Sequence, residues 1–218
     1  MIAKQLFLCA AIFAATALAA HGGDISQAYG TSTFQCAKNN GWEFVIIRSY
    51  CSYGGVDPNV VNTLAAAKAG GIQYHDIYHF PCYGKISASQ QIQDDINNVG
   101  LGNFGTIWMD IETNPSPGCG YSSDQAANCQ FLADLISAAK GMGATVGVYS
   151  SVYEWGQTVG AGCTAGADAG VPLWYADWDG TRSFGGFTPF GGWTTPAMKQ
   201  YGDSVGGICG INADADWW

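Results

Sequence analysis

The chain has 218 residues, enough for one domain with a substantial apolar core that does not depend on disulfides. Its 17 acidic residues outnumber 8 basic ones, and the net charge of -9 argues against nucleic acid as a partner. Two interpretations of the acidity stay open. It serves solubility, or it suits an acidic compartment in which part of the charge is protonated.

The N-terminal segment has the pattern of a secretory signal peptide. A lysine near the start precedes a short apolar run, Leu6 to Leu18, and small residues follow. The run is too short for a membrane anchor, so we expect cleavage after Ala19 or Ala20 and assign 1–20 to the signal and 21–218 to one domain. We expect no membrane insertion after signal removal, and a location that is secreted or lysosomal/phagosomal.

The cysteine pattern predicts disulfides rather than a metal site. Of the 8 cysteines, Cys9 leaves with the signal, and the odd number that remains predicts three bridges and one spare thiol. Cys51–Cys82 is the first pair we expect, because both residues follow apolar runs typical of neighbouring parallel strands. No C-x-x-C pair occurs and the histidines do not cluster with cysteines, so we expect no metal and no cofactor.

From Thr33 to Ser150, segments with helical signals alternate with β-prone apolar runs, a pattern typical of parallel strands joined by crossover helices. The expected helices are 33–40, 57–71, 87–100 and 122–141, and the expected strands are 42–50, 72–80, 105–112 and 144–150.

The last third of the chain loses this rhythm. We expect a loop over 155–170 and then strands at 171–176, 197–201 and 211–218. Together with a short extended piece at 22–26, these strands would close a barrel without complete β/α units. The predicted fold is therefore α/β, an irregular TIM-like β/α barrel of about five β/α units closed by additional strands.

Two carboxylates end the strand expected at 105–112. Asp110 and Glu112 lie two positions apart, so they share one face at roughly 6–7 Å, given a rise of ~3.3 Å per residue. That separation suits a carboxylate pair that flanks a glycosidic bond. The spacing alone is not specific, because Asp177/Asp179 and Asp214/Asp216 repeat it.

A barrel of this type places functional groups at the carboxyl ends of several strands. A mouth rich in carboxylates with aromatic walls suits a sugar, whereas the chain lacks a phosphate-binding loop and a Gly-x-Ser-x-Gly elbow. The residues that would face this mouth are Asp24, Tyr78, Asp110, Glu112, Trp174, Asp177 and Asp214.

A series of short motifs follows in a specific order and spacing. They are Gly23-Asp24-Ile25-Ser26, Phe44 to Arg48, Ala67 to Gly71, Tyr78-His79-Phe80, Asp110-Ile111-Glu112, Val148-Tyr149-Ser150, Leu173 to Ala176, Gln200-Tyr201 and Ala213-Asp214. With them the chain resembles the glycoside hydrolase family 25 lysozymes, from Gly22 to the C-terminus. Its cysteines make it similar to the lysozyme-like proteins of protists and nematodes.

The resemblance implies catalytic roles for Glu112, Asp110, Asp24 and Asp214. Glu112 would be the general acid, and Asp110 would steady the substrate's 2-acetamido group, whose oxygen attacks the anomeric carbon with retention. Asp24 and Asp214 would hold the other carboxylates and sugar hydroxyls in place. The substrate-binding residues that it implies are Tyr78, Tyr149, Trp174 and Gln200.

The implied activity is that of a muramidase, which hydrolyses the β-1,4 bond between N-acetylmuramic acid and N-acetylglucosamine in bacterial peptidoglycan. We expect a monomer that serves antibacterial defence or digestion. Two other functions stay open: an inactive carbohydrate-binding protein on a lysozyme scaffold, and a chitinase of the Asp-x-x-Asp-x-Asp-x-Glu kind. Gly105 and Trp108 occupy that motif's first two aspartate positions.

Other polar residues are open to simpler interpretations. Asp216 competes with Asp214, because both would share one face of the last strand, and the match of Ala213-Asp214 to the family favours Asp214. We expect Asp177 and Asp179 in a solvated loop, and His79 as a packed scaffold residue rather than a base.

Overall fold

A computed structural model describes residues 20–203 and 208–218, and the expected signal segment lies almost entirely outside them. One nine-stranded sheet forms the centre of the molecule, in the order β1-β9-β8-β7-β6-β5-β4-β2-β3 with a further pairing of β1 and β2. The strands are β1 (His21–Ile25), β2 (Phe44–Cys51), β3 (Gly55–Val56), β4 (Tyr74–His79), β5 (Thr106–Asp110), β6 (Thr145–Ser150), β7 (Leu173–Ala176), β8 (Met198–Gly202) and β9 (Asp214–Trp217).

The additional pairing of β1 with β2 closes the sheet into a barrel, with β3 attached outside the ring. Neighbouring strands from β1 through β2, β4, β5, β6, β7 and β8 run parallel, and β9 lies antiparallel between β8 and β1. The predicted fold class is confirmed: β/α units build most of the wall, and strands close it.

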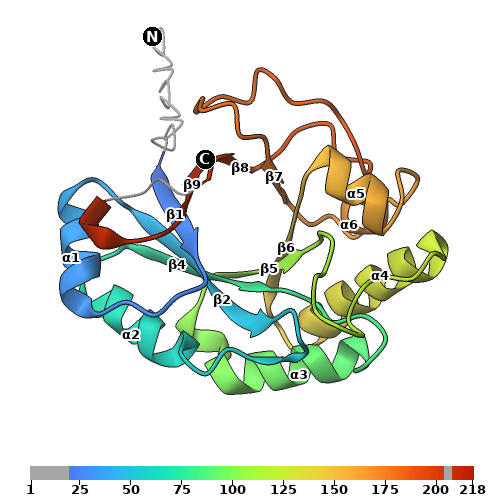
Figure 1. Cartoon of the computed structure of the whole chain (residues 1–218), viewed down its shortest axis with the longest axis horizontal. Coiled ribbons are helices and arrows are strands. Elements are labelled where there is room, and N and C mark those ends of the chain that lie inside the picture. The colour runs from blue at the N-terminus through green and yellow to red at the C-terminus, as the bar shows by residue number, and fades with distance from the viewer. Residues whose placement is uncertain (1–19, 204–207) are drawn as a thin grey trace, which may run out of the picture.

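Helices pack around the outside of this barrel (Figure 1). Some of them begin at a side-chain cap: the side chains of Ser87 and Asp124 accept bonds from the backbone N–H groups of Gln90 and Ala127. The helices are α1 (Thr31–Asn39), α2 (Val60–Ala69), α3 (Ala88–Val99), α4 (Gln125–Gly141), α5 (Val152–Thr158) and α6 (Ala165–Asp168), with 3-10 turns at Leu101–Asn103 and Ile208–Gly210. Among the described residues, no helix is both long and apolar enough to cross a membrane.

The loop expected over 155–170 is wrong, because this segment contains the end of α5 and all of α6. Trp155 explains the difference. Its indole is buried, packs against Trp193 and donates a hydrogen bond from Nε1 to the carbonyl of Cys163. This packing holds a glycine- and alanine-rich segment that has low helical propensity of its own.

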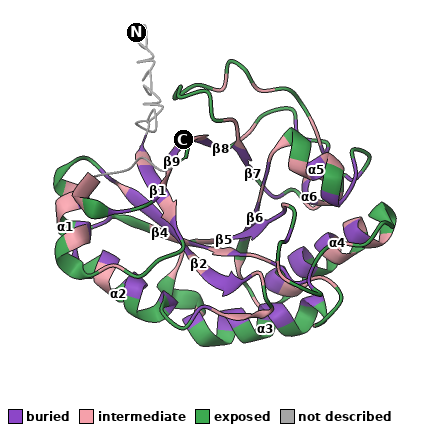
Figure 2. Cartoon of the chain, viewed as in Figure 1, coloured by how far each residue is buried: buried purple, intermediate pink, exposed green. Residues whose placement is uncertain are grey.

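The core has two parts. One fills the space between the strands and the surrounding helices, and Figure 2 shows the buried residues on the strands and on one side of the helices. The other lies inside the barrel and is rich in aromatic side chains. Its buried members are Ala20, Phe44, Ile46, Trp108, Trp174 and Met198.

Three disulfides and one free thiol are present, as the cysteine count predicted. The bridges are Cys36–Cys209, Cys82–Cys119 and Cys129–Cys163. The predicted Cys51–Cys82 bridge is wrong: Cys51 is free and buried, with its Sγ 3.7 Å from Asp57 Oδ2. The chain after β4 turns instead toward the loop that follows β5, where Tyr83 N donates to the Cys119 carbonyl.

Candidate functional site

A pocket of about 190 Å³ lies at the carboxyl ends of the parallel strands. Every site residue predicted from the sequence lines it, whereas Asp177 does not. The lining residues are Asp24, Ser26, Arg48, Ser52, Tyr78, Phe80, Asp110, Glu112, Tyr149, Trp174, Gln200 and Asp214.

Strand pairing brings the four acids together. Asp110 is the last residue of β5 and pairs in register with Tyr149 of β6, and Glu112 follows two residues later. Asp24 and Asp214, almost at opposite ends of the sequence, are paired directly between β1 and β9. The antiparallel β9 thus adds an acid to a mouth otherwise built by the carboxyl ends of parallel strands.

Asp110 and Glu112 interact electrostatically. Burial, followed by the negative charges of Glu154, Asp24 and Asp214, raises the pKa of Glu112 to about 7. Burial and the neighbouring Glu112 also raise the pKa of Asp110, and Asp110 Oδ1 is buried without a hydrogen-bond partner among the described residues. The pair therefore retains a proton near neutral pH, as a general acid requires.

Asp24 is held by a chain of hydrogen bonds. Gln200 Nε2 donates to Asp24 Oδ2 at 2.7 Å, and Gln200 Oε1 accepts bonds of 2.8 Å from Tyr149 Oη and from Trp178 Nε1. Burial and the charge of Asp214 raise the pKa of Asp24 to about 7. Gln200 thus fixes the orientation of Asp24 and leaves this carboxyl protonated in part at neutral pH.

Asp216 lies behind the pocket wall rather than in it, which agrees with the preference for Asp214 as the pocket residue. It is fully buried, its Oδ1 accepts a 2.9 Å bond from Trp174 Nε1, and its carboxyl contacts that of Asp24. Sequence reasoning did not foresee this contact, although the Asp214/Asp216 spacing places both acids on one face of β9.

Trp174, which the resemblance implies as a substrate-binding residue, is almost fully buried. Trp174 lines the pocket but is only 2% exposed, and its ring centroid lies 4.4 Å from that of Tyr149 and 5.8 Å from that of Trp108. Most of the Trp174 indole therefore belongs to the barrel core. Trp178 is 58% exposed, and sequence reasoning did not select it as a site residue.

The structure agrees with two of the simpler interpretations of polar residues. His79 is a buried scaffold residue, as predicted, with Nδ1 2.8 Å from Asp95 Oδ2. Asp177 and Asp179 lie in a partly exposed loop outside the pocket, as predicted, and the sequence did not reveal that both carboxylates pair with the buried Lys199 Nζ, at 3.6 and 2.7 Å.

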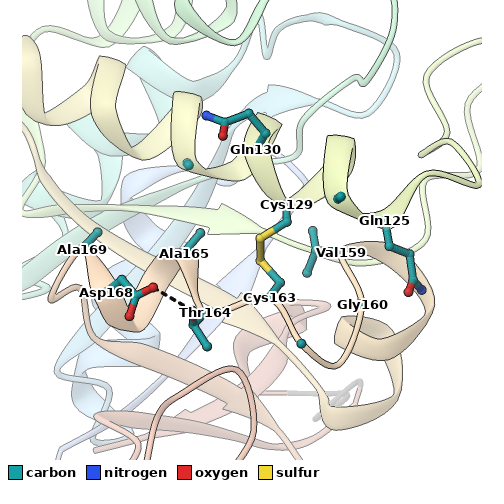
Figure 3. A pocket seen from close by; sticks show the side chains of 13 residues that line it. Gln125, Cys129, Gln130, Val159, Gly160, Cys163, Thr164, Ala165, Asp168 and Ala169 are labelled. Atoms are coloured by element: carbon teal, nitrogen blue, oxygen red, sulfur yellow. Dashed lines mark hydrogen bonds between the residues drawn. A yellow bond between two sulfur atoms is a disulfide. The ribbon is translucent and has the colours of Figure 1, made fainter.

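A larger hollow of about 760 Å³ lies between α4 and the α5–α6 segment (Figure 3). The Cys129–Cys163 disulfide crosses it, and Asp168 is the acid among its lining residues, bound by Thr164 Oγ1. It lacks the paired carboxylates of the smaller pocket. Within residues 20–203 and 208–218, no group of three or more His, Cys, Asp or Glu side chains is arranged to hold a metal ion.

Comparison with known proteins agrees with this geometry. Residues 15–201 match the family model described as "Lysozyme-like protein 1". "Probable GH family 25 lysozyme 4" of Dictyostelium discoideum is 44% identical over 199 residues, which cover 90% of this chain and 89% of that protein. The chain belongs to the lysozyme-like proteins of glycoside hydrolase family 25.

The chain is also similar to a nematode protein, to a counting factor and to a solved muramidase structure. "Lysozyme-like protein 5" of Caenorhabditis elegans is 34% identical over 98% of this chain and 99% of its own length. "Counting factor 50" of D. discoideum is 36% identical over 89% of this chain and 64% of its own. The muramidase of Acremonium alcalophilum shares the fold, with a TM-score of 0.75 at 22% identity over 91% of this chain and 93% of that one.

Proposed function

We propose that this family 25 protein is a muramidase, which hydrolyses the β-1,4 bond between N-acetylmuramic acid and N-acetylglucosamine in bacterial peptidoglycan. The observation that carries the proposal is the convergence of four carboxyl groups, Asp24, Asp110, Glu112 and Asp214, on one pocket. Two of them have a pKa raised to about 7, so protonated and ionised carboxyls coexist there near neutrality.

The proposed roles follow from position. Glu112 donates its proton to the leaving glycosidic oxygen, while Asp110, at the end of β5, steadies the substrate's acetamido group as its oxygen attacks the anomeric carbon. Water then attacks the same carbon and gives a proton to the Glu112 carboxylate, which restores the acid and retains the configuration. Asp24 and Asp214 hold the remaining sugar hydroxyls.

We further propose secretion, or delivery to a lysosomal or phagosomal compartment, after removal of residues 1–20, and a role in antibacterial defence or digestion. Three disulfides support an oxidising route, since such bonds persist in secreted proteins.

A second candidate is a carbohydrate-binding protein without catalysis. Its support is the similarity to "Counting factor 50", whose name mentions no lysozyme. The buried, protonated carboxyls favour the enzyme, because binding alone does not require the unfavourable burial of several acids.

Purified bacterial cell walls and chitin, offered in parallel between about pH 4 and 7, separate these functions. The muramidase proposal predicts clearing of the walls with new reducing ends on N-acetylmuramic acid, and little release from chitin. Chitin hydrolysis without wall clearing would overturn the substrate assignment. Sedimentation with the walls without any new reducing ends would support the binding protein instead.

A further inference from the structure

Glu154, in the first turn of α5, contacts the backbone directly after Glu112. Its Oε2 accepts bonds from Thr113 N at 2.7 Å and from Thr113 Oγ1 at 2.8 Å. Glu154 is itself fixed, because its N–H donates to the capping Ser151 Oγ at 3.0 Å and its carbonyl accepts from Thr158 Oγ1 at 2.7 Å. The Thr113 bonds thus hold the carboxylate, and the backbone bonds fix the helical turn that carries it.

The anchored segment needs such support, since β5 ends at Asp110 and Glu112 lies beyond the strand ladder. On one side of Glu112, Ile111 N donates to the Tyr149 carbonyl and the Ile111 carbonyl accepts from Ser150 Oγ at 2.7 Å. On the other side, Thr113 is held by Glu154. The backbone of Glu112 is therefore fixed from both directions.

Glu154 also brings a negative charge close to Glu112. After burial, it is the largest contributor to the raised pKa of Glu112. The other charged groups around this carboxyl are Asp24 on β1, Asp214 on β9 and Asp110 on β5, with Arg48 of β2 facing Asp110. Glu154 does not line the pocket, so its effect on the reaction passes through Glu112.

We propose that Glu154 is a positioning residue for the general acid: it fixes the Glu112 backbone through Thr113 and directs a negative charge at the Glu112 carboxyl. This inference rests on the proposed function for the role of Glu112, but the contact and the charge are testable without it. With Glu154 present, Glu112 stays protonated to a higher pH than it would with the charges of the pocket residues alone.

Substitutions separate the two contributions. Glu154→Gln keeps an acceptor oxygen for Thr113 and removes the charge, whereas Glu154→Ala removes both. The matched control for loss of one negative charge is Asp134→Asn. Asp134 is an exposed acid on α4 whose Oδ1 accepts a hydrogen bond from Gln130 Nε2. Circular dichroism verifies that each variant is folded.

Two readouts are needed: the pH profile of kcat on cell walls and an NMR titration of the Glu112 carboxyl, which requires no activity. In Glu154→Gln we expect the midpoint of the kcat profile and that of the NMR titration each to fall by about 0.5 to 1 pH unit, because a neighbouring negative charge is lost. The kcat at acid pH should stay within about threefold of wild type. In Glu154→Ala we expect a loss of kcat at every pH of about tenfold or more, with KM little changed. Asp134→Asn should match the wild type.

The outcomes also separate this inference from the proposed function. An unchanged Glu112 midpoint in Glu154→Gln, or an unchanged kcat in Glu154→Ala, overturns the role of Glu154 while wild-type activity still supports the muramidase. If the wild type hydrolyses no cell wall, the muramidase fails, and a shifted NMR midpoint still supports the electrostatic link between Glu154 and Glu112.

Discussion

The carboxyl groups of Asp24 and Asp216 lie close together across the adjacent strands β1 and β9. Two carboxyls at close range are stabilised when one carries a proton that it can donate to the other. Burial raises the pKa of Asp216 well above its usual range, and its Oδ2 receives no donor from the described N–H and O–H groups. We therefore expect Asp216 to hold a proton that it can donate to Asp24.

We expect Asp216→Asn to stay active, at about a tenth of wild-type turnover or more, because the amide supplies a permanent donor to Asp24 and an acceptor to Trp174. Asp216→Leu should lose more activity and stability, since it leaves the Trp174 N–H buried and unpaired at a cost of about 1–3 kcal/mol. Thermal denaturation and wall hydrolysis of the two variants test this. Equal damage in both would contradict a shared proton.

Stability should fall as the pH rises from about 4 to 7. The pKa values of Glu112 and Asp24 are raised to about 7, so the folded state binds more protons than the unfolded chain over this range. The stabilisation that these two protonated carboxyls give to the folded state is complete below the pKa values of the unfolded chain, and it is lost above about pH 7. In Glu112→Gln, which cannot ionise, Tm should depend less on pH and exceed that of wild type near pH 8. The corresponding gain in the free energy of unfolding is up to about 3 kcal/mol. A steeper decline in the variant would contradict the assignment.

Lys199 should control the loop that follows β7 more than it controls global stability. Its buried ammonium pairs with Asp179 and Asp177, and these side chains are partly exposed, so water can hydrate them when the partner is lost. We expect Lys199→Met to change Tm by less than about 3 °C but to speed proteolysis within 177–193. The exposed Lys85→Met is the control. An unchanged rate of proteolysis within 177–193 in Lys199→Met would exclude this role of Lys199.

Thiol counting tests the disulfide pattern. Protein that lacks residues 1–19 should show no reactive thiol when folded and one after denaturation without reductant, because Cys51 is buried and free. Peptide mapping should then place the label on Cys51. A label on Cys119 would indicate the Cys51–Cys82 pair that the sequence suggested.

The sequence predicts the barrel well because strand and helix periodicities, caps and turns are local properties. It also predicts Asp24, Asp110 and Glu112 in the pocket, since residues at the carboxyl ends of parallel strands must converge. Asp214, at the start of the antiparallel β9, follows from the family resemblance instead. It does not predict α5 and α6, which depend on the burial of Trp155, or the choice between Cys51 and Cys119 as the partner of Cys82. The roles of Asp216 and Glu154 arise from contacts between distant strands and loops, so local patterns carry little sign of them.

The most direct test of the account compares wild type, Glu112→Gln and Asp134→Asn for the release of reducing ends from purified cell walls at about pH 5 to 6. Because glutamine cannot donate the required proton, we predict a loss of about a hundredfold or more in Glu112→Gln with folding intact, while Asp134→Asn keeps wild-type turnover. Near-normal turnover in folded Glu112→Gln would contradict the central claim that Glu112 is the general acid of a muramidase.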